Sequence, residues 1–118
     1  MILLIIEDNI NIAASFKERL EHYKIEYKIA KTGVEAYKIL YETLLSNEFD
    51  YIITNIGLPD ENGIEIVKFI KSKFNSKIII YSGKNYDLYK YKFPNDYFYS
   101  KKENSPQDII DMIMNNML

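Results

Sequence analysis

The sequence predicts an α/β fold in which a doubly wound parallel sheet carries helices on both faces. Two observations predict it: short apolar runs alternate with amphipathic stretches, and helix-start signals stand between them. The length agrees, because 118 residues form one compact domain and 47% apolar residues can fill its core. Strands that alternate with helices in this way are joined by right-handed crossovers, so we expect a parallel sheet.

Five segments are predicted to be strands. Ile2–Ile6 is a continuous apolar run, as expected for a strand that is covered on both faces. Glu26–Ala30 is less apolar and should lie near an edge of the sheet. The remaining strands are Asp50–Thr54, Lys77–Tyr81 and Tyr97–Ser100. The apolar stretches Ile2–Ile6, Tyr51–Thr54 and Ile78–Tyr81 should be central, because they have no polar face to turn to water.

Four helices are predicted from apolar residues at helical spacing. Asn9 can cap the first, Thr32-Gly33 breaks the chain before the second, and Ser105-Pro106-Gln107-Asp108 is a strong start for the last. The apolar stripes are Ile12, Phe16, Leu20 and Tyr23; Ala36, Ile39, Leu40, Thr43 and Leu44; Ile66, Val67, Ile70 and Phe74; and Ile109, Ile110, Ile113, Met114 and Met117. Between Ser82 and Lys101 the helical repeat is poor, so a helix there should be short or irregular.

Composition excludes several classes of protein. A net charge of −2 provides no basic field to attract nucleic acid or an anionic membrane. The chain has no cysteine, which excludes disulfides and thiolate metal sites and fits a reducing, cytoplasmic location. The apolar run Ile2–Ile6 is too short for a signal peptide or a membrane span. We expect residues 1–118 to be a single domain without an output domain.

The segment that follows the third predicted strand carries the strongest functional signal. It reads Thr54-Asn55-Ile56-Gly57-Leu58-Pro59-Asp60-Glu61-Asn62-Gly63. This segment resembles the phosphoacceptor loop of bacterial two-component response-regulator receiver domains, where an aspartate, an apolar residue, any residue, Leu-Pro and an acidic turn closed by Gly follow a strand. The resemblance implies a flavodoxin-like (βα)5 sheet with strand order 2-1-3-4-5. It covers essentially the whole chain.

Asn55 stands where the resemblance places the phosphoacceptor aspartate. An amide is a poor nucleophile and cannot form the acyl phosphate on which the family's switch depends. The chain is therefore identified as an atypical receiver, a pseudo-receiver that is not conventionally phosphorylated.

Two adjacent carboxylates, Glu7 and Asp8, follow the first predicted strand. Carboxylate oxygens at a strand end can hold a hard cation such as Mg²⁺, with water completing the coordination. The resemblance implies a Mg²⁺ site formed by Glu7, Asp8, Asn55 and the backbone carbonyl of Gly57. Because Asn55 contributes an oxygen without a charge, we expect this site to be weakened. No other cofactor is expected.

Three further positions match the family's switch residues. The resemblance maps Ser82 onto the hydroxyl that bonds the phosphoryl group, Lys101 onto the lysine that neutralises it, and Phe98 onto the aromatic that moves inward on activation. Each also has an ordinary interpretation: Ser82 ends a strand, Phe98 is core, and Lys101 pairs with Asp8. Lys102 replaces the family's usual proline, so we expect the loop there to be rebuilt.

Tyrosines gather late in the chain, where more than half of the 11 lie between residues 81 and 99. Tyrosine favours interfaces because it combines a large area with a polar tip. The face formed by the fourth helix, the fifth strand and the last helix is where receiver domains usually meet partners. We therefore predict a protein partner or a homodimer contact through Tyr86, Tyr89, Tyr91 and Tyr99.

These observations predict a receiver-like signalling domain that acts through protein–protein interaction and is not an enzyme. One alternative is a conventional single-domain response regulator captured as an Asp-to-Asn variant at position 55. Another is an enzyme, or a protein that binds a flavin or another small ligand, on the same fold, since fold alone does not fix function.

Overall fold

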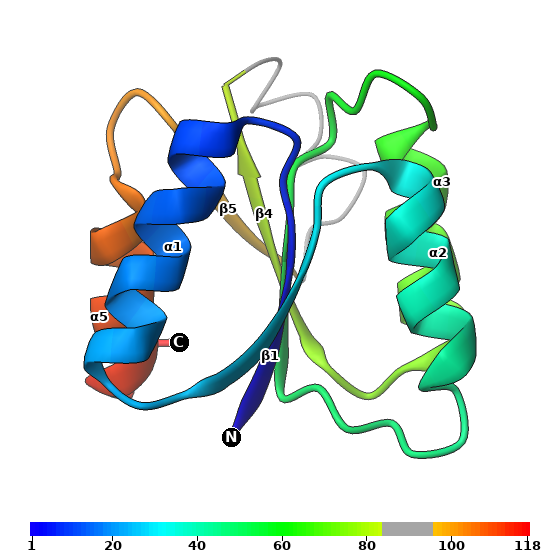
Figure 1. Cartoon of the computed structure of the whole chain (residues 1–118), viewed down its shortest axis with the longest axis horizontal. Coiled ribbons are helices and arrows are strands. Elements are labelled where there is room, and N and C mark those ends of the chain that lie inside the picture. Colours follow the sequence, from blue (N-terminus) through cyan, green and yellow to red (C-terminus); the bar gives the residue numbers. More distant parts are fainter. Residues whose placement is uncertain (84–95) are drawn as a thin grey trace.

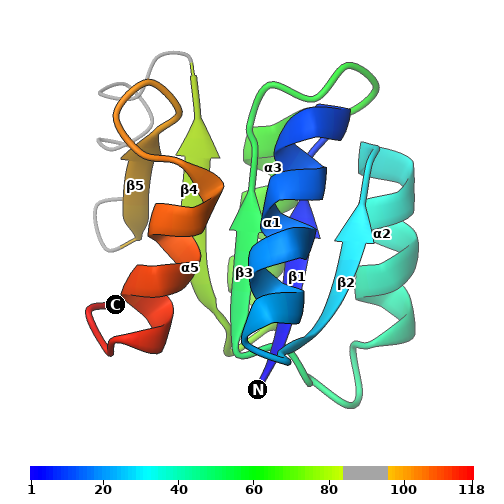
Figure 2. The same cartoon turned by 60° about the vertical axis from the view of Figure 1, so that its left-hand side comes forward.

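The computed structural model describes residues 1–83 and 96–118 and places five parallel strands in one sheet. The strands are β1 (Ile2–Ile6), β2 (Glu26–Ala30), β3 (Tyr51–Thr54), β4 (Lys77–Ser82) and β5 (Tyr97–Ser100). The helices are α1 (Ile10–His22), α2 (Gly33–Glu42), α3 (Gly63–Lys73) and α5 (Pro106–Met114). The sheet order β2-β1-β3-β4-β5 confirms the predicted topology, with β2 at one edge (Figure 2).

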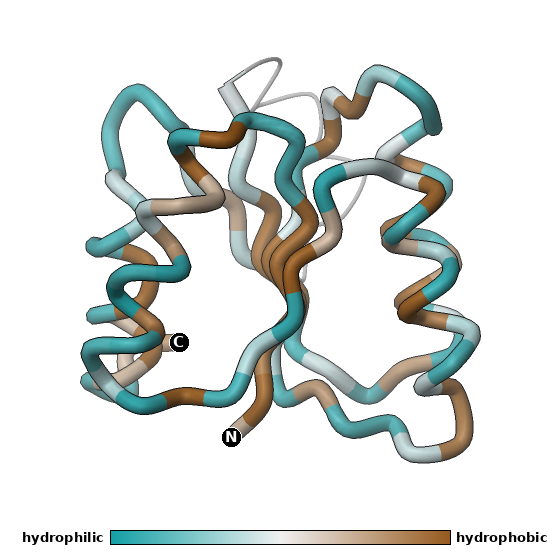
Figure 3. The backbone as a smooth tube through the Cα atoms, viewed as in Figure 1, coloured by the Kyte–Doolittle hydropathy of each residue, from teal (hydrophilic) through white to brown (hydrophobic). Residues whose placement is uncertain are grey.

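The helices form two layers, one on each face of the sheet. Figure 1 shows α1 and α5 on one side and α2 and α3 on the other. Each layer closes its own core cluster, with Phe16 and Ile110 in the first and Leu40 and Ile70 in the second. The hydropathy colouring in Figure 3 shows the apolar strands between these layers. Burial on both faces explains why β1, β3 and β4 are almost continuously apolar.

Helix starts follow polar capping residues, of which Asn9 and Ser105 were predicted from the sequence. The side chain of Asn9 accepts a hydrogen bond from the backbone N–H of Ile12, and Thr32 accepts one from Glu35. Ser105 and Asp108 form a reciprocal capping box at the start of α5, directly before Pro106. These local signals fix where each helix begins, and therefore where the preceding loop must end.

Three details differ from the sequence-based expectations: the start of β3, the end of β4, which is Ser82 rather than Tyr81, and the exposure of Met117. β3 begins at Tyr51 rather than Asp50, although the Asp50 backbone N–H still donates to the Ile2 carbonyl at 2.9 Å and the Asp50 carbonyl accepts from the backbone N–H of Lys77 at 3.0 Å. The predicted stripe of the last helix is wrong at Met117, which is 67% exposed because α5 already ends at Met114. The prediction of a short or irregular fourth helix falls largely in residues 84–95, outside the described part of the chain.

Close backbone packing shapes the loop between β3 and α3. A Cβ atom added to Gly63 would lie 2.2 Å from the carbonyl oxygen of Ile56, so only glycine fits there without a shift. The loop is therefore folded back on itself between Asn55 and the start of α3. Asn55 itself is held at the end of the sheet by its backbone N–H, which donates to the carbonyl oxygen of Ile6 at 2.9 Å.

Within residues 1–83 and 96–118, none of the helices is both long enough and apolar enough to cross a membrane.

Candidate functional site at the carboxyl edge of the sheet

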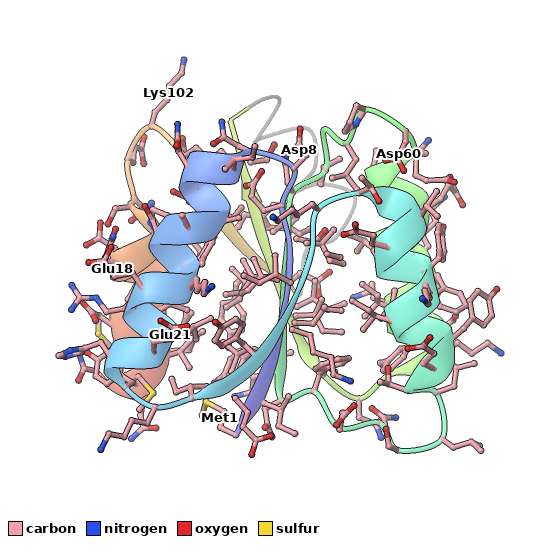
Figure 4. All side chains as sticks on the ribbon, viewed as in Figure 1. Met1, Asp8, Glu18, Glu21, Asp60 and Lys102 are labelled. Carbon is pink, nitrogen blue, oxygen red and sulfur yellow. The ribbon has the colours of Figure 1, made fainter. Side chains whose placement is uncertain are left out.

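The strand register brings the predicted site residues to one edge of the sheet. Ile6 of β1 pairs with Thr54 of β3, Thr54 pairs with Ile80 of β4, and Ile80 pairs with Phe98 of β5. All strands run in the same direction, so the residues that follow this row lie at the carboxyl edge. Ligand sites of open α/β sheets lie outside this edge. The side chain of Asp8 is labelled there in Figure 4.

Glu7 and Lys101 form an ion pair in this edge. Lys101 Nζ lies 2.7 Å from Glu7 Oε1, and the two side chains are 18% and 2% exposed. Burial raises the pKa of the Glu7 carboxyl, and the hydrogen bond and charge of Lys101 act in the opposite direction. The expectation that Lys101 pairs with Asp8 is wrong.

The register explains this choice of partner. Successive strand side chains alternate between faces, and Ile6 packs in the core cluster beneath α2 and α3. Glu7 therefore turns to the side of α1 and α5. Lys101 Nζ lies 5.8 Å from the ring centroid of Tyr81, which belongs to the cluster on that same side. Lys101 thus meets Glu7 rather than Asp8.

Asn55 directs its amide nitrogen at both carboxylates. Its Nδ2 donates to Asp8 Oδ1 at 2.9 Å and to Glu7 Oε2 at 3.4 Å. Its Oδ1 accepts a hydrogen bond from the backbone N–H of Gly57 at 3.3 Å. Asn55 is only 7% exposed, so these contacts satisfy an amide that has little access to water. An aspartate here could not make the two donor contacts.

The oxygen atoms at this edge determine how well a Mg²⁺ ion would fit. Glu7 and Asp8 offer two carboxylates, but Lys101 neutralises one of them and the Asn55 amide nitrogen faces both. Rotation of the Asn55 amide would turn its oxygen toward a cation. Within the described part of the chain, no cluster of three or more histidine, cysteine, aspartate or glutamate ligands is found. These residues fit a divalent cation held weakly by oxygen ligands.

Ser82 and Phe98 lie close to this edge in different environments. Ser82 is the last residue of β4 and is 3% exposed, and its carbonyl accepts a hydrogen bond from the backbone N–H of Lys101 at 3.2 Å. Phe98 is 7% exposed and belongs to the core cluster beneath α2 and α3. Phe98 therefore stands as a core residue in this structure, on the opposite face from Glu7.

The turn after β5 is held by hydrogen bonds from within the chain. The backbone N–H groups of Glu103 and Asn104 donate to the carbonyl of Ser100, and Lys102 N–H donates to the Ser100 hydroxyl at 3.1 Å. The side chain of Lys102 points away from the protein (Figure 4). The turn forms without the proline that the resemblance led us to expect.

Sequence reasoning missed Tyr81 as a support for the site. Its hydroxyl donates to the carbonyl oxygen of Asn104 at 2.6 Å, and its ring packs edge-on against Phe16 with 5.5 Å between the ring centroids. Burial, followed by the charge of Glu7, raises the pKa of Tyr81 to about 12. The only sequence signal for this role was that Tyr81 directly precedes Ser82, a predicted site residue.

Asp60 was also missed, and it ties the loop after β3 to the start of α2. Its carboxylate accepts hydrogen bonds from the backbone N–H of Gly33 at 2.8 Å and of Val34 at 3.1 Å. These bonds lower the pKa of the Asp60 carboxyl. Figure 4 shows Asp60 beside this helix end. The acidic turn predicted a loop but gave no signal for this distant contact.

Comparison with known proteins identifies the family. The sequence model described as "Response regulator receiver domain" matches residues 3–114. The chain belongs to the response regulator receiver domain family. This family consists of two-component signalling domains that work through contacts with other proteins.

Individual relatives agree with this membership. The receiver-domain chain is 35% identical over 83 residues to "Response regulator ArlR" of Staphylococcus saprophyticus, a match to 70% of this chain and 36% of that protein. A receiver domain structure from Clostridium thermocellum is 27% identical. The match covers 97% of this chain and 91% of the Clostridium chain, with a TM-score of 0.77. The structure of the Vibrio cholerae chemotaxis regulator CheY4 is 21% identical, and the match covers 97% of this chain and 96% of that one. Its TM-score is 0.78, and at this identity the likeness shows the fold alone.

Proposed function

We propose that this receiver domain signals without phosphorylation at position 55. The observation that carries the proposal is the Asn55 amide, which donates to Asp8 and Glu7 where the family's chemistry needs a nucleophilic carboxylate. The nitrogen lone pair of an amide is delocalised into the carbonyl, so Asn55 has neither the charge nor the nucleophilicity to accept a phosphoryl group. The Glu7–Lys101 ion pair already occupies the lysine that would neutralise that group.

Mg²⁺ would bind this receiver weakly. Glu7, Asp8, the Asn55 side-chain oxygen and the Gly57 carbonyl are the groups that would hold it. The cation would supply charge neutralisation at the carboxyl edge. Binding would compete with the Lys101 contact to Glu7 and with the Asn55 amide contacts, so affinity falls below that of a site with three carboxylates.

The domain is proposed to signal by binding a protein partner. The proposed partner face comprises β5, α5 and the segment before β5. Within it Tyr99 is half-buried, while Tyr86, Tyr89 and Tyr91 fall in residues 84–95, outside the described part of the chain. The assignment to a single domain over residues 1–118 and a cytoplasmic location, suggested by the absence of cysteine, remain predictions.

Beryllofluoride tests the proposal at position 55, because it mimics a phosphoryl group only when a carboxylate accepts it. Fluorine NMR with Mg²⁺ present should show no bound signal for the native chain. Asn55→Asp is the matched control for an acceptor carboxylate. A bound signal from the native chain that Asn55→Ala abolishes would overturn the proposal.

The partner face has its own test. In a pull-down from a lysate of the native cell, the Tyr89→Ala and Tyr91→Ala variants should recover less partner protein than the unaltered domain does. An interface anchor of this kind contributes more than about 1 kcal/mol to binding. Loss of folding in both variants, with partner recovery per folded molecule unchanged, would show that these rings are core residues.

A further inference from the structure

An aromatic surface lies on the outer side of the α2–α3 layer, away from the carboxyl edge. Tyr37, Tyr41 and Phe69 form it: the ring centroids of Tyr41 and Phe69 are 5.1 Å apart, and those of Tyr37 and Phe69 are 5.6 Å apart. Tyr41 is 60% exposed, and Leu45, just beyond α2, is 103% exposed. Tyr41 and Leu45 therefore expose apolar atoms to solvent on this side of the layer, next to the partly buried rings of Tyr37 and Phe69.

The same rings border an open groove between α2 and α3 of about 560 Å³. Its lining residues are Tyr37, Tyr41, Glu65, Lys68, Phe69 and Ser72. The groove thus combines an aromatic floor with one carboxylate and one ammonium group. Aromatic residues are enriched in protein interfaces, which makes a protein surface its natural occupant.

The two charges decide which protein surface fits. Glu65 and Lys68 lie one turn apart on α3, with 3.3 Å between Lys68 Nζ and Glu65 Oε1, and their side chains are 59% and 52% exposed. They cancel, so the groove favours neither an acidic nor a basic ligand. A two-fold axis between them would instead place each charge opposite the other residue of a second molecule. The patch is self-complementary, as an isologous contact requires.

We propose that the α2–α3 face binds a second copy of this chain. The α3 helices lie antiparallel across a two-fold axis between Glu65 and Lys68, so that Glu65 of each copy faces Lys68 of the other. Tyr41 and Phe69 of both copies cover one another and supply the apolar contact. This contact leaves the carboxyl edge free, and it is separate from the partner face formed by β5 and α5.

Sedimentation velocity measures the association. The native chain should shift from monomer to dimer as its concentration rises from about 1 µM to about 1 mM. Tyr41→Ala should weaken the dimer by about tenfold or more, because an exposed aromatic anchor is lost while the fold is kept. Met117→Ala removes an exposed apolar side chain elsewhere and should leave the dimer unchanged. A native chain that stays monomeric throughout overturns the proposal.

Charge reversal tests the pairing across the axis. Glu65→Lys and Lys68→Glu should each weaken self-association, because each homodimer then brings like charges together. An equimolar mixture of the two variants should form a heterodimer, since opposite charges again face each other. Glu18→Lys on α1, on the opposite helix layer (Figure 4), is the matched control and should dimerise normally. Failure of the mixture to associate, with both variants folded by circular dichroism, overturns the proposed geometry.

Discussion

Lys101 Nζ lies 2.7 Å from Glu7 Oε1. Among the described residues, Glu7 carries the only almost fully buried carboxylate at this edge of the sheet, and Lys101 is its ion-pair partner. Removal of Lys101 would leave that carboxylate without its cation. Burial already raises the pKa of Glu7, and loss of Lys101 should raise it further. The pair therefore links stability to pH through Glu7.

Lys101→Ala should lower the free energy of unfolding by about 3 kcal/mol near neutral pH, as expected when a buried pair loses one partner. A folded-state pKa above the unfolded value of 4.5 means that the native state binds more protons in the window above 4.5. Stability is then lost as pH rises through that window. The defect should be larger at about pH 8 than at about pH 5 in urea titrations.

Lys102→Ala is the matched control for this prediction. Lys102 is exposed and directed into solvent, so its removal should change stability by less than about 0.5 kcal/mol. An equal loss for both variants, or no dependence of the Lys101→Ala defect on pH, would contradict the role assigned to the ion pair.

Asn55→Asp should destabilise the metal-free domain and make it responsive to Mg²⁺. The change replaces a donor that contacts Glu7 and Asp8 with a third carboxylate, so like charges repel until a cation binds. Thermal unfolding should show a lower Tm in chelator than the native chain and a larger rise with added Mg²⁺. Asn55→Ala, which adds no charge, should show no enlarged Mg²⁺ response. Equal Mg²⁺ responses in all three proteins would refute this account of the site.

Gly63→Ala should destabilise the fold by about 1–3 kcal/mol, the range for overpacking at a tight contact. Its Cβ would lie 2.2 Å from the backbone oxygen of Ile56, which cannot move without shifting the loop that carries Asn55. Gly57→Ala is the control in the same loop, because a Cβ there meets nothing within 4 Å. Chemical denaturation should separate the two, and similar stabilities would show that the loop is not packed as described.

Tyr81→Phe should change the alkaline limb of the stability profile. Near neutral pH the variant loses the hydrogen bond to Asn104, at about 1 kcal/mol. The raised pKa of about 12 means that the unfolded chain ionises first, so the native chain loses stability as pH rises from the ordinary value of 10.0 toward 12. The variant lacks this loss, and its deficit should shrink over that range. A constant difference in urea titrations would contradict the assignment.

The sequence was sufficient for the topology because local signals agreed with tertiary burial. The apolar run Ile2–Ile6 indicated a strand covered on both faces, and Asn9 and Ser105 marked helix starts that the structure confirms. The Leu58-Pro59 turn and Asn55 identified the loop and its missing carboxylate. These features depend on neighbours in the chain, and the sequence records them directly.

Contacts between distant loops could not be predicted in the same way. Whether Lys101 meets Glu7 or Asp8 depends on the register of the strands and on which face each side chain takes. The bonds from Asp60 to the start of α2 join residues 27 and 26 positions apart, and no local pattern encodes them. Sequence patterns thus located the edge of the sheet, while the pairing of charges within it required the structure.

The mass of the intact protein after incubation with acetyl phosphate and Mg²⁺ tests the central claim most directly. Asn55 offers no carboxylate, so the native chain should gain no phosphoryl group at this position, whatever the reagent concentration. Peptide mapping of any product assigns the site of modification. An unchanged mass is the predicted result, and a phosphoryl adduct mapped to Asn55 would contradict the account.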